Sequence, residues 1–190
     1  MPALPTTPKG AATSRRILDA AAAEFAERGI AGARIDRIIA VAQTNKAQLY
    51  GYFGSKDGLF DAVVADCLGR NSVPFDASDL PGWAVGLYDE NLRSPAVARL
   101  LAWIRLERRP GGLVLDGMNL EPKIAAIAAE QAAGRVRAGD PADILTLVAG
   151  MAAAWSPAST AYAATATEPD ADHQRRRALL RETVARAVAP

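Results

Sequence analysis

The sequence predicts an all-α protein, and three observations carry that prediction. Apolar residues recur at spacings of three and four along most of the 190 residues, which is the period of an amphipathic helix. No segment alternates apolar and polar residues as a half-buried strand does. Glycine and proline separate the helical runs, and half of the residues are hydrophobic, which is enough for a packed core.

The chain is expected to begin with a flexible arm, followed by a long helix. Residues 1–12 contain three prolines and have no apolar period, so we assign them to the arm. A helix is expected from Thr13 to about Arg28, where Gly29 supplies the residue that ends many helices. Its apolar face consists of Ile17, Leu18, Ala21 and Phe25.

Two short helices are expected next, over 34–42 and 45–53, with a tight turn at Gln43 and Thr44. Asn45 is a favourable N-cap residue for the second of them. Gln48 stands three residues later, where its side chain can return a hydrogen bond to the cap in a capping box. Two short helices joined in this way and supported by a longer one make a helix-turn-helix arrangement.

A fourth helix, capped by Ser55, is expected to continue to about residue 70. Residues 13–70 are therefore predicted to form an N-terminal helix-turn-helix domain of three helices plus this linking helix. Residues 71–190 are predicted to form a second helical domain. Its helices are expected to begin near Pro81 and at Pro95, and to span 121–137, 141–155 and 172–187.

Composition excludes several classes of protein. Cys67 is the one cysteine and His173 the one histidine, so an internal disulfide, a thiolate zinc site and a multi-histidine metal site are all excluded. We expect no metal, no cofactor and no catalytic group. Cys67 is expected to pack as a buried thiol, and His173 to lie on the exposed start of the last helix. No secretory signal or membrane span is recognisable, so we expect a cytoplasmic protein that does not contact membranes.

The short helix over 45–53 has the character of a DNA-reading element. It offers polar side chains on one face, while Leu49 and Phe53 face its supports. Tyr50, Tyr52 and Lys56 are placed to reach phosphates. The net charge of +1 neither favours nor excludes nucleic acid, so this prediction depends on the pattern alone.

The stretch SRRILDAAAAEFAERGIAGARIDRIIAVAQTNKAQLYGYFGSKDGLFDAVV, from Ser14 to Val64, resembles the DNA-binding domain of the TetR family of transcriptional regulators. The blocks ILDAA, FAERG and LYGYFGSKDGLF are its most specific parts. SPAVARLLAWIRLERRP and AAGRVRAGDPADILTLVAGMAAAW resemble the C-terminal domain of one subgroup. The family places Arg34 at the start of the second helix, near the DNA backbone. The DNA-binding residues expected on these grounds are Arg34, Thr44, Asn45, Lys46, Gln48, Tyr50, Tyr52 and Lys56.

Three residues depart from the family pattern. Gln43 stands where the turn commonly has glycine, so Gln43 must adopt a left-handed conformation or the turn must differ. Ile39 replaces a small residue between the two short helices, and Gly51 replaces a residue that is often histidine. The first two substitutions bear on the geometry of base contacts, and the third removes one potential contact.

Large side chains and an apolar helix suggest two further roles for the C-terminal domain. An effector pocket between helices is expected to involve Trp83, Tyr88, Trp103, Met118, Met151 and Trp155, with core filling as the alternative for about half of them. The helices over 141–155 and 172–187 are expected to form a homodimer interface, which the resemblance also implies. Its predicted residues are Leu147, Val148, Met151, Leu180 and Val184.

The resulting prediction is a homodimeric regulator, a repressor, that leaves a palindromic double-stranded DNA operator when it binds a small-molecule effector. It is not expected to be an enzyme. One alternative is a helical small-molecule-binding protein or enzyme with a non-functional helix-turn-helix. Another is a nucleoid-type DNA binder without an effector, although the near-neutral charge argues against it.

Overall fold

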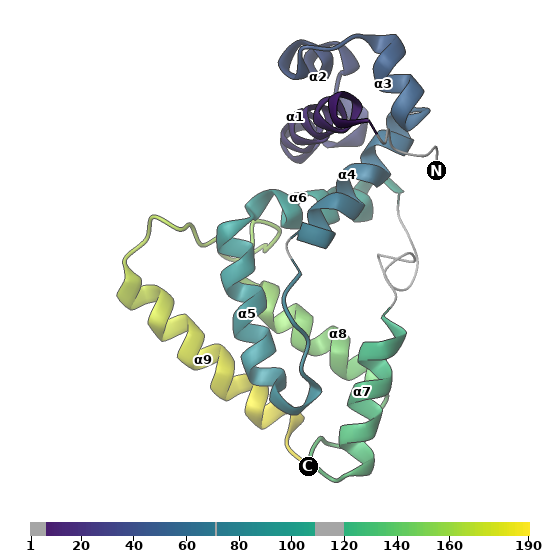
Figure 1. The fold of residues 1–190 in the computed structure, drawn as a ribbon. Coiled ribbons are helices and arrows are strands. Elements are labelled where there is room, and N and C mark those ends of the chain that lie inside the picture. The colour runs from purple at the N-terminus through teal and green to yellow at the C-terminus, as the bar shows by residue number, and fades with distance from the viewer. Residues whose placement is uncertain (1–6, 71, 109–119) are drawn as a thin grey trace. The chain divides into compact units, whose positions relative to one another are not determined.

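The computed structural model describes residues 7–70, 72–108 and 120–190 (Figure 1). Over these ranges the chain is helical with no strand, which confirms the predicted fold class. The chain divides into unit 1 (Met1–Ser72 and Ala96–Val114) and unit 2 (Val73–Pro95 and Leu115–Pro190). The elements are α1 (Pro8–Gly32), α2 (Ile35–Ala42), α3 (Lys46–Phe53), α4 (Lys56–Arg70), the 3-10 turn η1 (Ala77–Asp79), α5 (Leu80–Arg93), α6 (Pro95–Trp103), the π-helical turn η2 (Ile104–Arg108), α7 (Glu121–Ala132), α8 (Pro141–Ala152), the 3-10 turn η3 (Ala153–Trp155) and α9 (Asp170–Val188).

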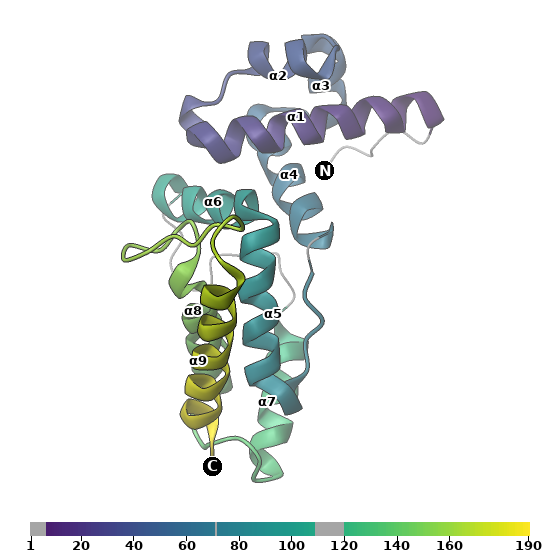
Figure 2. The same ribbon diagram turned by 90° about the vertical axis from the view of Figure 1, so that its left-hand side faces the viewer.

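In unit 1, the long helix α1 supports the three helices that follow it. It packs against α2, α3 and α4, and α3 also packs against α4 (Figure 2). Phe25 of α1 and Phe60 of α4 meet edge to face at 5.1 Å between ring centroids, and both are fully buried. Cys67 is buried on α4, as predicted, and its burial raises the pKa of the thiol. The core beneath α2 and α3 is thus aliphatic and aromatic.

The first helix begins earlier than expected. Residues 8–12, assigned to the flexible arm, form the first turns of α1. The side chain of Thr7 caps the helix by accepting a hydrogen bond from the backbone N–H of Gly10 at 3.2 Å, and Pro8 occupies the first helical position. The Thr7 cap and Pro8 are local signals of a helix start, and they were overlooked because residues 8–12 have no apolar period. Residues 1–6 of the predicted arm lie outside the described residues.

Gly29 interrupts α1 near its end, with φ 70° and ψ −179°. This backbone conformation is essentially restricted to glycine. A Cβ on Gly29 would also lie 2.8 Å from a carbon of the Trp103 indole and against the Glu107 carboxylate. Gly29 is therefore required both for the bend and for the close approach of α6 and η2.

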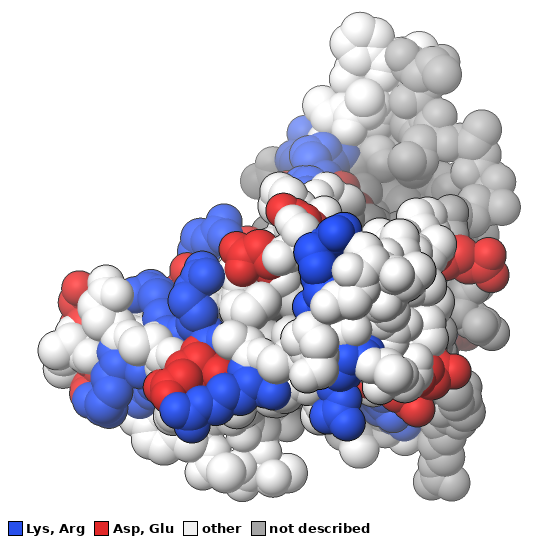
Figure 3. All heavy atoms as spheres, turned by 90° about the horizontal axis from the view of Figure 1, so that it is seen from below, with Lys and Arg blue, Asp and Glu red and all other residues white. Residues whose placement is uncertain are grey.

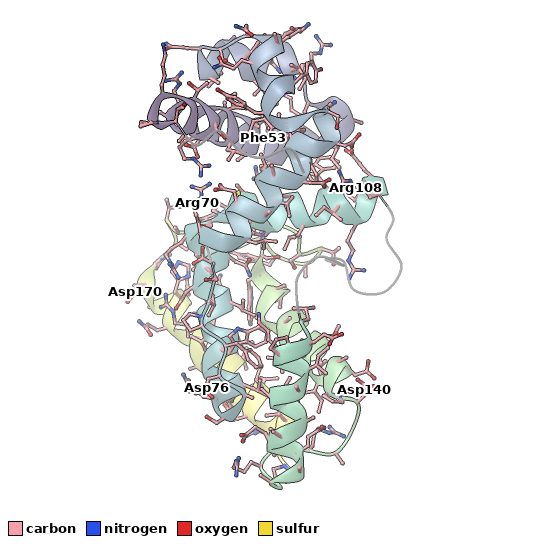
Figure 4. The ribbon with its side chains drawn as sticks, turned by 45° about the vertical axis from the view of Figure 1, so that its right-hand side comes forward. Phe53, Arg70, Asp76, Arg108, Asp140 and Asp170 are labelled. Carbon is pink, nitrogen blue, oxygen red and sulfur yellow. The ribbon has the colours of Figure 1, made fainter. Side chains whose placement is uncertain are left out.

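The segment from Ala96 to Arg108 belongs to unit 1, whereas the sequence assigned it to the second domain. The indole N–H of Trp103 donates to the Ala26 carbonyl at 3.3 Å. Glu107 accepts from the backbone N–H of Ala31 at 2.8 Å, and Arg108 pairs with Asp61 of α4 (Figure 4). These contacts join residues about fifty to eighty positions apart, which helical periodicity does not predict.

Unit 2 is organised around α5, which packs against both α8 and α9, and α8 also packs against α9 (Figure 2). Its core contains Leu80 and Tyr88 of α5, Val148 of α8 and Val184 of α9, each no more than 2% exposed. Helix α7 packs against α8. The predicted helices over 141–155 and 172–187 correspond to α8 with η3 and to α9.

Helix α7 is shorter than expected, ending at Ala132 rather than at residue 137. Gly134 adopts φ 69°, and the backbone N–H of Arg135 then donates to the Glu130 carbonyl at 3.0 Å. This is the hydrogen bonding of a glycine-terminated helix. The apolar Val136 beyond it is buried in the unit 2 core, which explains why the pattern looked like a longer helix.

Candidate nucleic-acid interface

The turn between α2 and α3 forms without the usual glycine. Gln43 adopts the left-handed conformation, with φ 50° and ψ 55°. Arg16 of α1 stabilises this turn by donating from Nε to the carbonyl of Ala42 at 3.1 Å. Gln43 therefore accommodates the turn itself, at the conformational cost that a side chain pays in this region.

Asn45 is the N-cap of α3, as predicted. Its Oδ1 accepts from the backbone N–H of Gln48 at 2.9 Å. The expected return bond from Gln48 does not form. Instead, the Thr44 hydroxyl donates to Gln48 Oε1 at 2.7 Å, and Gln48 Nε2 donates to the Tyr52 hydroxyl at 3.0 Å. Thr44, Gln48 and Tyr52, spaced four residues apart, thus form a hydrogen-bonded chain along one side of α3.

The buried side of α3, next to this chain, holds the helix in place. Leu49 is fully buried and Phe53 is 3% exposed, and α3 packs on α1, α2 and α4 (Figure 4). The outer side exposes Tyr50, which is 40% accessible, and Gly51, where an added Cβ would meet nothing within 4 Å. The short helix is therefore anchored by two apolar side chains and has an open outer face.

Lys46 lies on this surface with a partner from the preceding helix. Its Nζ is 2.8 Å from a carboxylate oxygen of Asp36, and this hydrogen bond raises the pKa of Lys46. Both side chains are more than half exposed. Solvent screens such a pair, so Lys46 can exchange Asp36 for another anion at little cost in free energy.

Arg34 and Lys56 flank the two short helices. Arg34 is the exposed N-cap residue of α2, and its backbone N–H donates to Glu24 of α1. Lys56 begins α4, and its Nζ donates to the carbonyl of Ala31 at 3.2 Å. Ser55 caps α4 by accepting from the backbone N–H of Gly58. All eight predicted DNA-contact residues belong to unit 1 and are exposed or half-buried.

The predicted effector residues do not come together as one group. Trp83, Tyr88, Met151 and Trp155 belong to unit 2, where Tyr88 and Trp155 meet edge to face at 5.9 Å between centroids. Trp103 belongs to unit 1 and is bonded to α1. Met118 lies outside the described residues.

The predicted dimer interface needs correction. Val148, Leu180 and Val184 are at most 2% exposed because they form the core between α5, α8 and α9 of one chain. Leu147 is 51% exposed and Leu179 is 53% exposed, so these two leucines are the accessible apolar residues of α8 and α9. Periodicity located the apolar helices but assigned the inner faces to a partner.

His173 was expected to be exposed but is buried, at 5%. Its ring lies against Tyr88, whose hydroxyl is 2.8 Å from Nδ1. Sequence reasoning gave weight to its charged neighbours and overlooked its spacing. His173 precedes Leu180, Val184 and Val188 by 7, 11 and 15 residues, so that all four lie on the buried stripe of α9.

The exposed surface elsewhere has mixed charge. Figure 3 shows acidic and basic side chains intermingled on the face viewed. On α9, Arg175 pairs with Asp172 at 2.5 Å, and Arg186 pairs with Glu182 at 2.6 Å. Within the described ranges, no three His, Cys, Asp or Glu residues are grouped to hold a metal ion, and no helix is long and apolar enough to cross a membrane.

Two family models match the chain. Residues 17–63 match the model for bacterial regulatory proteins of the tetR family, and residues 79–186 match the tetracyclin repressor-like C-terminal domain. The HTH-type transcriptional repressor SCO4008 of Streptomyces coelicolor is 41% identical over 147 residues, covering 74% of this chain and 77% of that protein. The chain belongs to the TetR family.

Other TetR-family proteins agree with this assignment. The crystal structure of the putative transcriptional regulator SCO4942 from Streptomyces coelicolor superposes with a TM-score of 0.77 at 33% identity, covering 93% of this chain and 98% of that one. The repressor NicS of Pseudomonas putida is 42% identical over 52 residues, which is 27% of this chain and 24% of NicS. The protein is thus a DNA-binding transcriptional regulator of the helix-turn-helix type.

Proposed function

We propose that this TetR-family protein is a homodimeric repressor whose binding to a palindromic operator is controlled by a small molecule. The observation that carries the DNA-binding part is the arrangement of α3. Leu49 and Phe53 anchor it from below, Asn45 caps it, and its outer face is free to enter a major groove. The repressor assignment is supported by likeness to SCO4008, which is named as a repressor.

The DNA-contact residues divide into two roles. Tyr50, Lys56 and Arg34 are exposed or half-buried around the short helices and contact phosphates in this proposal. Gln48 and Lys46 lie on the reading helix and contact base edges. Two hydrogen bonds fix the Gln48 amide, which retains one N–H and one oxygen lone pair. This donor and acceptor pair is complementary to the N7 acceptor and the N6–H₂ donor on the major-groove edge of adenine.

Dimerisation supplies the second reading helix. The exposed Leu147 of α8 and Leu179 of α9 provide apolar surface for a second copy. Two copies related by a two-fold axis would place their α3 helices in successive major grooves, about 34–36 Å apart. The operator would then have a two-fold symmetric sequence that matches the two-fold axis of the dimer.

Control by an effector requires differential binding. A ligand lowers operator affinity only if it binds the DNA-incompetent arrangement more tightly than the competent one. The aromatic residues Trp83, Tyr88 and Trp155, together with Met151, make unit 2 the expected location. Repression would end when the effector accumulates.

The test begins with selection of bound duplexes from a random-sequence pool, followed by measurement of affinity against salt concentration. We expect enrichment of a two-fold-symmetric site and a steep fall in affinity with salt. Lys56→Ala should weaken binding to all sequences and reduce the salt slope by about one, whereas Gln48→Ala should relax selection at one position of each half-site. Arg105→Ala, at an exposed residue of η2, is the matched control. A pool that enriches no symmetric site contradicts the proposal.

Oligomeric state is measured separately by analytical ultracentrifugation. Leu147→Glu with Leu179→Glu should convert a dimer to a monomer and abolish binding to the full palindrome. An exposed control on α9, Glu182→Gln, should remain dimeric. A wild-type protein that sediments as a monomer at micromolar concentration would refute the dimer.

A further inference from the structure

A cluster of polar side chains is buried in unit 2 between α5 and α9. Tyr88 is 1% exposed, and its hydroxyl lies 2.8 Å from Nδ1 of His173. Arg176, one turn further along α9, is 8% exposed. The cluster lies near the start of α9, which Asp170 marks in Figure 4. Polar groups at this depth require partners.

The Tyr88 hydroxyl lies against Nδ1 of His173, so the direction of this hydrogen bond depends on the imidazole tautomer. When the hydroxyl donates to Nδ1, an uncharged imidazole carries its own proton on Nε2, and the free edge of His173 is a donor. Interaction with the Tyr88 hydroxyl, and with Glu168, raises the pKa of the Arg176 guanidinium, which donates at every N–H.

Two buried nitrogen atoms of the cluster have no hydrogen-bond acceptor in the part of the chain that the structure describes. His173 Nε2 and Arg176 Nη1 are both inaccessible to solvent and have no hydrogen-bond partner. His173 and Arg176 lie three residues apart on the buried face of α9, and it is Nδ1 of His173 that contacts the Tyr88 hydroxyl, which leaves Nε2 on the other edge of the ring. A buried donor without an acceptor costs free energy, and a single acceptor that carries more than one lone pair is able to satisfy two neighbouring donors.

The side of the cluster nearest the α8–α9 connection is covered by residues of that connection. Arg176 Nη2 donates to Glu168 Oε2 at 2.7 Å, and the guanidinium lies 4.9 Å from the centre of the Tyr162 ring. Glu168 also accepts from the backbone N–H of Thr165 at 2.8 Å. The Trp155 ring packs edge to face against Tyr88 beside the same connection. The connection is held over the cluster by this ion pair, by the Tyr162 ring on Arg176, and by a backbone hydrogen bond from Ala164 to the Trp155 carbonyl at 3.0 Å.

We propose that His173 Nε2 and Arg176 Nη1 bind the carboxylate of a small organic acid, whose apolar part lies beside Trp155. Carboxylate oxygens accept from guanidinium and imidazole N–H groups in short, charge-assisted bonds. Entry requires residues 162–168 to move away from Arg176. The inference depends on the proposed effector-controlled function for its consequence at the operator, whereas carboxylate binding is measured without DNA.

His173 is the one histidine of the sequence, which makes it a specific reporter. The experiment titrates full-length protein, labelled with ¹⁵N in histidine, with sodium benzoate and sodium acetate at constant ionic strength. The imidazole ¹⁵N signals are recorded by long-range correlation NMR. We expect a saturable shift of the Nε2 signal with benzoate and a weaker response with acetate. Benzamide and benzyl alcohol, which have the ring without the negative charge, should produce no saturable shift.

Three variants assign the residues. Arg176→Met should weaken benzoate binding roughly tenfold or more, because it removes the charged donor. Arg175→Met is the matched control, since Arg175 is 67% exposed and pairs with Asp172 at the surface. Glu168→Gln removes the competing carboxylate and should strengthen benzoate binding, which keeps the proposal testable if Arg176→Met does not fold.

Four results would overturn the proposal. The first is the absence of any saturable Nε2 shift up to tens of millimolar carboxylate. The second is a shift with benzamide as large as the shift with benzoate, which would show that the site accepts a neutral ligand and does not require a negative charge. The third is unchanged benzoate affinity in Arg176→Met, and the fourth is unchanged affinity in Glu168→Gln. Benzoate that binds with unaltered operator affinity supports the site and contradicts the effector role alone.

Discussion

The two units satisfy their polar groups in different ways. In unit 1, the polar side chains along one side of α3 bond to neighbours three or four residues away, as Asn45 does with Gln48 and Gln48 with Tyr52. In unit 2, Tyr88 of α5 contacts His173 of α9 and Arg176 bonds to Glu168, while the buried nitrogens His173 Nε2 and Arg176 Nη1 have no partner among the described residues. Unit 1 therefore presents a surface that is set before DNA arrives, and unit 2 retains a deficit that a ligand can satisfy.

This difference implies that the α3 surface of unit 1 is rigid, whereas the polar cluster of unit 2 responds to a ligand. A surface whose side chains are already bonded loses little conformational entropy on binding. A buried group without a partner raises the free energy of the empty state, and a ligand that supplies the partner recovers that free energy. The comparison predicts that substitutions in unit 1 act on stability or reading, and that the polar cluster of unit 2 contributes little to stability.

The largest expected effect is that of Gly29→Val. The conformation of Gly29 is essentially closed to a β-branched residue, and its Cβ would collide with Trp103 and Glu107. We expect the free energy of unfolding to fall by about 3 kcal/mol or more. Urea denaturation followed by circular dichroism measures it. Gly69→Ala is the control, because nothing lies within 4 Å of that Cβ, and it should be as stable as wild type or more so.

Glu24→Gln tests the ion pair between α1 and α2. Hydrogen bonding to Arg37, and to the backbone of Arg34, lowers the pKa of Glu24. The stabilisation is complete above the ordinary glutamate pKa of about 4.3 and is lost as the pH falls through the lowered folded-state value. The variant should melt a few degrees lower at pH 7, with the difference shrinking below pH 4. A difference that stays constant across this range contradicts the assignment.

Removing the Tyr88–His173 pair tests the deficit in unit 2. The double variant Tyr88→Phe with His173→Leu deletes both bonded groups and the unpaired Nε2–H. Replacing both partners by apolar groups is nearly neutral, so we expect thermal unfolding within about 1 kcal/mol of wild type. Tyr88→Phe alone leaves Nδ1 without its donor and should be less stable than the double variant. The reverse order of stability would show that the cluster stabilises the fold.

The smallest effect is expected at the turn. Gln43→Gly relieves the left-handed conformation, and the gain is partly offset by the flexibility of glycine in the unfolded chain. We expect an increase of about 0.5 kcal/mol in the free energy of unfolding. Gln43→Ala keeps the strain and should be no more stable than wild type.

Local signals account for what the sequence predicted well. Asn45 and Ser55 cap their helices as expected because capping involves residues two or three positions apart. Gln43 adopts the left-handed conformation, which is one of the two outcomes that the sequence left open for a turn without glycine. The assignment of DNA-contact residues stays a prediction, since exposure makes them available without showing what they contact.

Long-range packing accounts for what the sequence did not predict. Trp103 and Glu107 join unit 1 through contacts with residues seventy-six or seventy-seven positions earlier. His173 is buried because Tyr88 of α5 receives it, and its charged sequence neighbours gave the opposite indication. Val148, Leu180 and Val184 belong to the core because α5, α8 and α9 pack against one another. Helical periodicity specifies an apolar face but does not identify the element that covers it.

The hydrogen-bonded chain of Thr44, Gln48 and Tyr52 bears on how operator preference can change in evolution. A substitution at Gln48 alone removes both bonds and leaves two half-buried hydroxyls to find new partners. If Gln48 contacts a base, as proposed, a substitution that changes the base preference at this position also changes the bonding of Thr44 and Tyr52. We expect Thr44, Gln48 and Tyr52 to vary together among relatives that recognise different operators. Substitutions at these three positions should then occur in combination rather than singly.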